Sequence, residues 1–284
     1  MYDIILDTLM DGIRLLPFLF VTYIVMEYIE HKMSAGTRRV VQASGRFGPL
    51  IGSIAGIFPQ CGFSAAAASL YAGRVITRGT LIAIFLSTSD EMLPVFISQQ
   101  VPVKMILSVL GMKVIIGMAA GFLLDLVFSL VKKEPQQEMD IHHMCEHDHC
   151  HCEDGIIKSA LVHTAQIFFF ILLVSFILNL VISGVGEESL TEIILNHPLV
   201  GPLLSGVVGL IPNCAASVVI TQLYLDGAMS LGAMMSGLLV GAGVGLIVLY
   251  RTNDSLKENL KITAILYVIG VVAGMAVDFL GITL

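Results

Sequence analysis

Two short stretches of this chain place proline, an amide side chain and a cysteine together inside apolar sequence. They read GIFPQCGFS, from Gly56 to Ser64, and GLIPNCAAS, from Gly209 to Ser217. Proline ends a helix and leaves backbone carbonyl groups without their helical partners. The amide oxygen and the thiolate that follow it are ligands for metal ions.

The serine three residues after each cysteine adds a hydroxyl on the same side of the helix that follows. The candidate metal ligands of the two stretches, which follow Pro59 and Pro212, are Gln60, Cys61, Ser64, Asn213, Cys214 and Ser217. Proline kinks and small polar residues also occur in membrane helices as packing features alone. Because the arrangement occurs twice, we favour a shared binding site.

A pair of acidic residues interrupts another apolar segment, FLSTSDEMLP. Asp90 and Glu91 fall about two-thirds of the way along the helix that we predict there, and Ser87 lies one turn before them. An acid at the centre of a membrane costs about 2.5–3.5 kcal/mol, so such residues are usually functional. Lys113 on the next predicted helix lies at a comparable depth. We predict that one acid binds a cation or carries protons while Lys113 balances its charge, the alternative being an ion pair that only fixes packing.

A short polar segment from His142 to Gly155 contains five histidines, three cysteines and four acids. Its candidate ligands are His142, His143, Cys145, His147, His149, Cys150, His151 and Cys152. Imidazole and thiolate groups at this density suit Zn²⁺ or Cu ions. The spacing matches no closed zinc-finger pattern, so we expect a flexible chelating loop, the alternative being a solvated polar loop.

The composition is that of a protein embedded in a membrane. Of the 284 residues, 56% are hydrophobic and 13% charged, whereas soluble domains carry about 25% charge. Apolar stretches long enough to span a bilayer include Leu161–Ile182, Met229–Tyr250 and Ile262–Leu284. We therefore predict an all-α polytopic membrane protein that is not an enzyme and has no nucleic-acid partner.

The chain repeats itself at an offset of 153 residues. This single register pairs Pro59 with Pro212, Cys61 with Cys214, and Asp125 with Asp278, and it requires no gap. The predicted organisation is a transmembrane repeat at 1–130, a cytoplasmic His/Cys-rich linker at 131–158 and a second transmembrane repeat at 159–284. Asp125 and Asp278 recur near helix ends, which favours a structural role for both.

Each repeat is predicted to contain three long helices and two half-helices. In the first repeat the long helices are expected near Gly12–Glu30, Thr80–Ile97 and Lys104–Leu130. Between the first two, Gly48–Gly73 has arms of about a dozen residues, each about half a bilayer long. The corresponding segment of the second repeat is Gly201–Asp226. Whether these half-helices, which meet at the Pro-x-Cys break, form re-entrant hairpins or short spans remains open at this point.

The positive charges predict that the two repeats are inverted. With both termini outside, twelve of the fifteen Lys and Arg residues lie on the inner face. These residues are Lys32, Arg38, Arg39, Arg46, Arg74, Arg78, Lys132, Lys133, Lys158, Arg251, Lys257 and Lys261. Inverted repeats with interrupted helices are the plan of many transporters, whose sites lie near the membrane midplane. Glu27 and Asn179 are weaker candidates for that site.

The PQC and PNC stretches, the STSDE segment and the His-rich loop together resemble the ten-helix heavy-metal exporter family. Members of that family are labelled arsenic efflux proteins or manganese transporters. The resemblance extends over nearly the whole chain. It implies metal or metalloid efflux at the cytoplasmic membrane of a prokaryote, and it points to Pro59–Cys61, Ser87–Glu91 and Pro212–Cys214.

Three functions are consistent with these features. The first is export of a divalent metal, Mn²⁺ or Zn²⁺ favoured by the acid and amide oxygens, in exchange for protons. The second is an arsenite or organoarsenical permease in which Cys61 and Cys214 are thiol ligands. The third is a transmembrane thiol–disulfide electron carrier, which ranks lowest because it needs neither Asp90 nor Glu91. The predicted partners are the metal ion as substrate, protons and the lipid bilayer, with no prosthetic group; the oligomeric state, a homodimer included, is left open.

Overall fold

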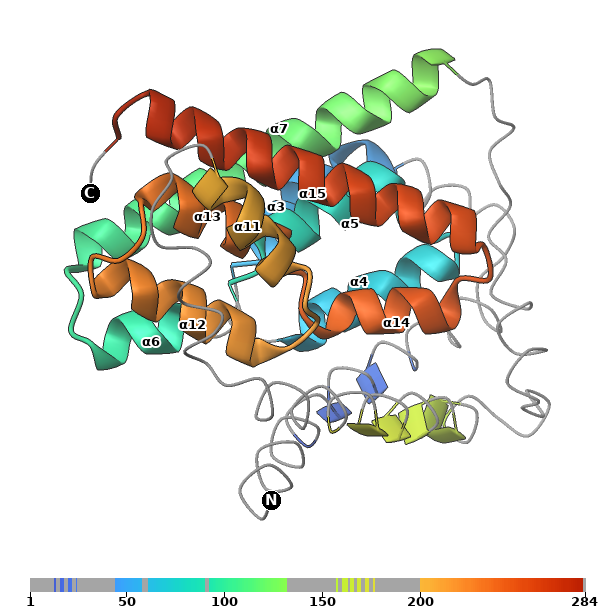
Figure 1. Ribbon diagram of the computed structural model, residues 1–284. Helices are drawn as coiled ribbons and strands as arrows, with labels where there is room; N and C mark the ends of the chain where they lie inside the picture. Colours follow the sequence, from blue (N-terminus) through green and yellow to red (C-terminus); the bar gives the residue numbers. More distant parts are fainter. Residues whose placement is uncertain are drawn as a thin grey trace.

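The computed structural model describes residues 44–57, 61–89, 92–131 and 200–282, together with scattered helical positions between 13 and 24 and between 157 and 176 (Figure 1). All regular structure in these ranges is helical. The described positions within the predicted helices Gly12–Glu30 and Leu161–Ile182 are helical as well. The described part of the chain is therefore entirely helical.

The helices of the first half are mostly short, and one long helix follows them. They are the 3-10 helix η1 (Ser44–Phe47), α3 (Gly48–Ala55), α4 (Cys61–Ala72), α5 (Arg78–Ser87), α6 (Met92–Ser98) and α7 (Val103–Val131). Thr77 caps α5, since its hydroxyl oxygen accepts a hydrogen bond from the Thr80 N–H at 3.0 Å.

The second half has the same order of short and long helices. They are α11 (Val200–Gly209), α12 (Cys214–Leu225), α13 (Leu231–Val240), α14 (Val244–Thr252) and α15 (Leu256–Phe279). Ser230 caps α13 as Thr77 caps α5. The helices α4 and α5 begin and end 153 residues before α12 and α13, respectively.

Two helices that we predicted to be continuous are interrupted. The segment Thr80–Ile97 ends as α5 at Ser87 and resumes as α6 at Met92. The segment Met229–Tyr250 is divided between α13 and α14, because Gly243 adopts φ 52° and ψ −138°, which residues with a Cβ rarely adopt. The expectation of unbroken helices at these two places is therefore wrong.

The last helix also differs from the prediction. It begins at Leu256, six residues before the apolar stretch Ile262–Leu284, because Ser255 caps its first turn. It ends at Phe279, and Gly281 follows with a left-handed φ of 61°. The predicted helix Lys104–Leu130 corresponds closely to α7.

The long helices pack closely against the short helices that precede them. A Cβ added to Gly79 of α5 would lie 2.2 Å from the Gly121 carbonyl oxygen of α7. A Cβ added to Gly232 of α13 would lie 2.2 Å from the Gly274 carbonyl oxygen of α15. Small residues thus allow the backbones to approach as they do in membrane helix pairs.

The two halves interlock through their shorter helices. The helix α4 packs against α14, and α6 packs against α12 (Figure 1). These two pairs correspond to each other when the halves are exchanged, since α4 matches α12 and α6 matches α14 in the 153-residue register. Each pair therefore joins a short helix of one half to a short helix of the other.

Four segments of the described chain are long and apolar enough to cross a membrane. They are Arg78–Ser98, which includes the α5–α6 interruption, Val103–Leu130, Leu231–Thr252 and Leu256–Phe279. The outer sides of α7 and α15 expose large apolar side chains such as Leu123 and Val272, as helices that face lipid do. The chain is a multi-pass membrane protein.

Candidate functional site

The two proline-containing stretches lie between helices. Cys61 is the first residue of α4, and Cys214 is the first residue of α12. Pro212 and Asn213 are half-buried in the connection from α11 to α12, where the Asn213 N–H donates a hydrogen bond to the Ile211 carbonyl at 2.7 Å. Pro59 and Gln60 lie outside the described residues, as do the side chains of both cysteines.

The serines that follow these cysteines differ in burial. Ser64 of α4 is fully buried, whereas Ser217 of α12 is half-buried. A Cβ added to Gly245, in the first turn of α14, would lie 2.7 Å from the Ser64 Cβ. The interruption between α13 and α14 therefore lies next to the predicted ligand Ser64, and sequence reasoning missed it because these positions carry no polar side chain.

The end of α5 is rich in hydroxyl groups that bond to their own helix. The Ser87 hydroxyl donates to the Ala83 carbonyl at 2.8 Å, and the Thr88 hydroxyl donates to the Ile84 carbonyl at 2.7 Å. Ser87 still has two oxygen lone pairs to offer a cation. Asp90 and Glu91 follow between α5 and α6 and lie outside the described residues.

Lys113 joins the interrupted helices of the two halves. Its side chain comes from α7 and is 1% exposed. The ammonium group donates a hydrogen bond to the Thr88 carbonyl, directly after α5, and another to the Leu238 carbonyl of α13 at 2.8 Å. The C-terminal ends of helices carry partial negative charge, so they stabilise a cation placed there. A positive group thus occupies the point where α5 and α13 end.

Sequence reasoning identified Lys113 but not these two partners. Both are backbone carbonyl groups, and no residue type marks a carbonyl that a helix interruption exposes. Within the described ranges no three His, Cys, Asp or Glu side chains come together as a metal centre. The His142–Cys152 loop, Glu27 and Asn179 lie outside those ranges.

The paired aspartates hold the starts of two helices. Asp125 accepts hydrogen bonds from the Gly79 N–H at 2.9 Å and the Thr77 hydroxyl at 2.8 Å. Asp278 accepts the equivalent bonds from the Gly232 N–H at 2.8 Å and the Ser230 hydroxyl at 2.6 Å. Each carboxylate satisfies a backbone donor that a helix start leaves unpaired, which is the structural role expected of both residues.

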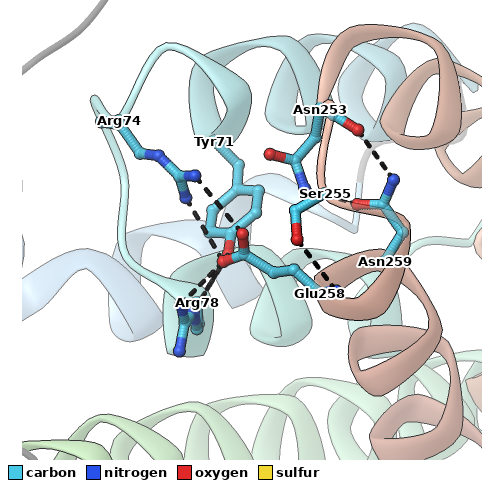
Figure 2. Close-up of polar contacts among 7 residues, drawn as sticks. All are labelled: Tyr71, Arg74, Arg78, Asn253, Ser255, Glu258 and Asn259. Carbon is cyan, nitrogen blue, oxygen red and sulfur yellow. Dashed lines mark hydrogen bonds and ion pairs between the residues drawn. The ribbon is translucent and has the colours of Figure 1, made fainter.

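A second polar cluster lies away from these interruptions, where the α4–α5 turn meets the start of α15 (Figure 2). The carboxylate of Glu258 receives hydrogen bonds from Tyr71, Arg74 and Arg78. Burial lowers the pKa of Arg74, while the hydrogen bond and charge of Glu258 raise it, and the net pKa lies above its ordinary value. Sequence reasoning counted the arginines only as topology signals and missed Glu258.

The fold and the carbonyl groups that bind Lys113 together define a polytopic helical membrane protein. Its interrupted helices α5 and α13 end at a buried positive charge. A family model described as "Putative, 10TM heavy-metal exporter" matches residues 1–188. The chain therefore belongs to this family of ten-helix heavy-metal exporters. The match ends before the GLIPNCAAS stretch and so covers less of the chain than the sequence resemblance suggested. No curated protein and no solved structure matches the chain.

Proposed function

We propose that this protein is a secondary transporter that exports a divalent transition metal across the cytoplasmic membrane in exchange for protons. Mn²⁺ and Zn²⁺ are the favoured ions. The proposed site lies near the midplane, between the two Pro-x-Cys connections and the Ser87–Glu91 segment. Membership of the heavy-metal exporter family supports the general class.

The observation that carries this proposal is the binding of the Lys113 ammonium group by two backbone carbonyls. A buried ammonium group is held by carbonyl oxygens at the ends of α5 and α13, one helix from each half. In transporters with interrupted helices, such ends and the unwound backbone beside them bind the transported cation. We propose that Lys113 balances the negative charge of the cation-binding acid, Asp90 or Glu91, when no metal is bound.

The ligand chemistry favours an oxygen-bound ion. Backbone carbonyls, the acids and the amides of Gln60 and Asn213 are hard donors, which suit Mn²⁺ and also bind Zn²⁺. Cys61 and Cys214 begin equivalent half-helices, and this symmetry is what favours the second candidate, an arsenite or organoarsenical permease. The third candidate is a thiol–disulfide electron carrier. Its chemistry does not need the two carbonyl groups that bind Lys113.

The proposed architecture is a pair of inverted repeats with both termini outside. The helix bounds and the aspartate contacts that recur after 153 residues support the repeat, and the distribution of Lys and Arg supports the inversion. We further propose that 131–158 is a cytoplasmic loop whose histidines and cysteines capture metal before transport.

The test is metal uptake into proteoliposomes that contain a pH-sensitive dye. Wild-type protein is expected to move Mn²⁺ or Zn²⁺ with protons moving in the opposite direction. Because one of the two acids is proposed to bind the ion or its protons, Asp90→Asn or Glu91→Gln should lower the metal flux about 10-fold or more. Asp226→Asn, which removes an exposed carboxylate after α12, should leave the flux unchanged.

The alternatives predict different results in the same vesicles. Arsenite flux that requires Cys61 and Cys214 but neither acid would establish the permease. If Asp90→Asn and Glu91→Gln both retain full metal flux, the exchange mechanism is wrong.

A further inference from the structure

The cluster around Glu258 joins the two halves of the protein. Arg74 contacts both carboxylate oxygens of Glu258, with N–O distances of 3.3 Å. The Arg78 Nη2 lies 2.7 Å from Glu258 Oε1, and the Arg78 Nε donates to the Tyr71 hydroxyl oxygen at 3.1 Å. In Figure 2 the two guanidinium groups and the Tyr71 ring converge on this carboxylate. Tyr71, Arg74 and Arg78 belong to the first half, and Glu258 belongs to the second.

The cluster is largely withdrawn from solvent. The Glu258 side chain is 13% exposed, and those of Arg74 and Arg78 are 22% and 26% exposed. The Arg78 guanidinium also lies 5.2 Å from the ring centre of Phe128 on α7, a cation–π contact. Partly buried, charge-assisted hydrogen bonds of this kind are stronger than exposed ion pairs.

The backbone of Arg74 is held in an unfavourable conformation. Its φ is 57°, in the left-handed region that a residue with a Cβ seldom occupies. The equivalent position in the second half is Gly227, with φ 73°. The same two hydrogen bonds close both turns. In the first half the Arg74 N–H donates to the Tyr71 carbonyl and the Val75 N–H donates to the Leu70 carbonyl. In the second half the Gly227 N–H donates to the Tyr224 carbonyl and the Ala228 N–H donates to the Leu223 carbonyl. The fold therefore accepts glycine here, and arginine contributes through its side chain.

The cluster has no counterpart at the pseudo-symmetric position. In the 153-residue register Arg74, Arg78 and Glu258 correspond to Gly227, Leu231 and Met105, none of which is charged. Tyr71 corresponds to Tyr224. The aspartate contacts, by contrast, lie within each half and occur in both. This cluster thus joins the halves and has no charged counterpart at the symmetric positions.

We propose that Tyr71, Arg74, Arg78 and Glu258 form an ion-pair lock that holds the two halves together on the face that carries the α4–α5 turn and the start of α15. This inference rests on the proposed transport function, in which the halves must separate on that face to admit the ion. Because of the lock, the resting state of the protein is the conformation in which this face is closed. At the equivalent positions Gly227, Leu231 and Met105 carry no charge, so no such ion-pair lock can form there.

The lock is tested by replacing its residues with their own symmetric counterparts. Glu258→Met removes the carboxylate of the cluster, and Arg74→Gly removes one of its two guanidinium partners. Arg74→Gly also relieves the left-handed backbone, so this variant is expected to fold. Hydrogen exchange is measured by mass spectrometry on the purified full chain in lipid nanodiscs without added metal. Each variant is read in the segment that it does not alter: 71–78 for Glu258→Met, and 253–260 for Arg74→Gly.

Both variants are expected to exchange these segments roughly tenfold or more faster than wild type, since the lost hydrogen bonds involve charged groups. Exchange in 224–231, on the opposite face, should not accelerate. Lys257→Met is the matched control, because it removes an exposed charge from the same turn of α15 without touching the cluster. It should exchange like wild type.

Two results would overturn the lock. One is unchanged exchange in 71–78 and 253–260 for both variants, with size-exclusion profiles and helical circular dichroism showing folded protein. The other is equal acceleration on both faces, which indicates general destabilisation. Because the exchange measurement involves no metal and no flux, it can fail while metal transport succeeds, and the reverse also holds.

Discussion

Asp125 and Asp278 show how single side chains shape this protein. Each accepts two hydrogen bonds where α5 or α13 begins, and each ties that start to the long helix of its own half. In apolar surroundings a backbone N–H without a partner is costly. These carboxylates therefore stabilise the scaffold on which the interrupted helices are arranged.

Replacing either aspartate should destabilise the scaffold by a similar amount. Asp278→Ala removes acceptors for Gly232 and Ser230, so the free energy of unfolding should fall by about 2 kcal/mol. Asp125→Ala should have the same effect. Thermal unfolding in detergent, followed by circular dichroism, measures both. Wild-type stability in either variant would contradict the structural role.

Lys113 is the residue on which the proposed transport site depends most. Its buried ammonium group is a cation that belongs to the protein, and carbonyl oxygens at the ends of two helices bind it. The same oxygens suit a metal ion. The structure thus places a positive charge at the position where the proposed site needs one when it is empty.

At the scale of elements, close helix contacts depend on glycine. The backbones of α13 and α15 approach where Gly232 faces the Gly274 carbonyl, and those of α5 and α7 approach where Gly79 faces the Gly121 carbonyl. A methyl group has no room at either place. These contacts fix the long helices relative to the interrupted ones, and so fix the depth of Lys113 on α7.

Gly232→Ala is therefore expected to destabilise the protein, by about 1–3 kcal/mol, because the new methyl group would overlap backbone. Gly111→Ala is the matched control on α7, since an added Cβ there has no atom within 4 Å. It should be neutral or stabilise by roughly 0.5–1 kcal/mol through helix propensity. Melting temperatures of the two purified variants provide the comparison. Equal effects would mean that the close approach does not matter.

At the scale of the whole molecule, the two halves interlock through α4 with α14 and α6 with α12. This packing between the halves brings the helix interruptions of both halves close together. An inverted orientation of the halves would then allow each to close one side of the membrane, which is the basis of alternating access. The Glu258 lock acts on the same arrangement by favouring one closed face.

The proposed inverted topology predicts the location of the C-terminus. A green fluorescent protein fused after Leu284 should be dark and an alkaline phosphatase fused there should be active, because the C-terminus is expected outside. Fusions placed after Asp254, in the turn before α15, should give the reverse pattern. A fluorescent C-terminal fusion would show that the proposed orientation is wrong.

The sequence by itself determined the class of protein and several of its elements. Its apolar runs predicted an all-helical membrane protein, and its motifs indicated the exporter family. The 153-residue register identified Asp125 and Asp278 as an equivalent pair. These features depend on local composition and on spacing along the chain, which the sequence contains directly.

The tertiary structure alone decided where the helices are interrupted a second time and what Lys113 binds. The segments Thr80–Ile97 and Met229–Tyr250 are each long enough to form one continuous helix, and their polar residues and glycines do not by themselves show where each is divided. The Thr88 and Leu238 carbonyls have no side-chain signature. Glu258 lies in the first turn of α15, and no feature of the surrounding sequence marks it as part of a cluster. Its partners Arg74 and Arg78 are about 180 residues away in the chain and reach it only in the folded protein. Such contacts are set by how helices cross, and the order of residues does not encode that in any local pattern.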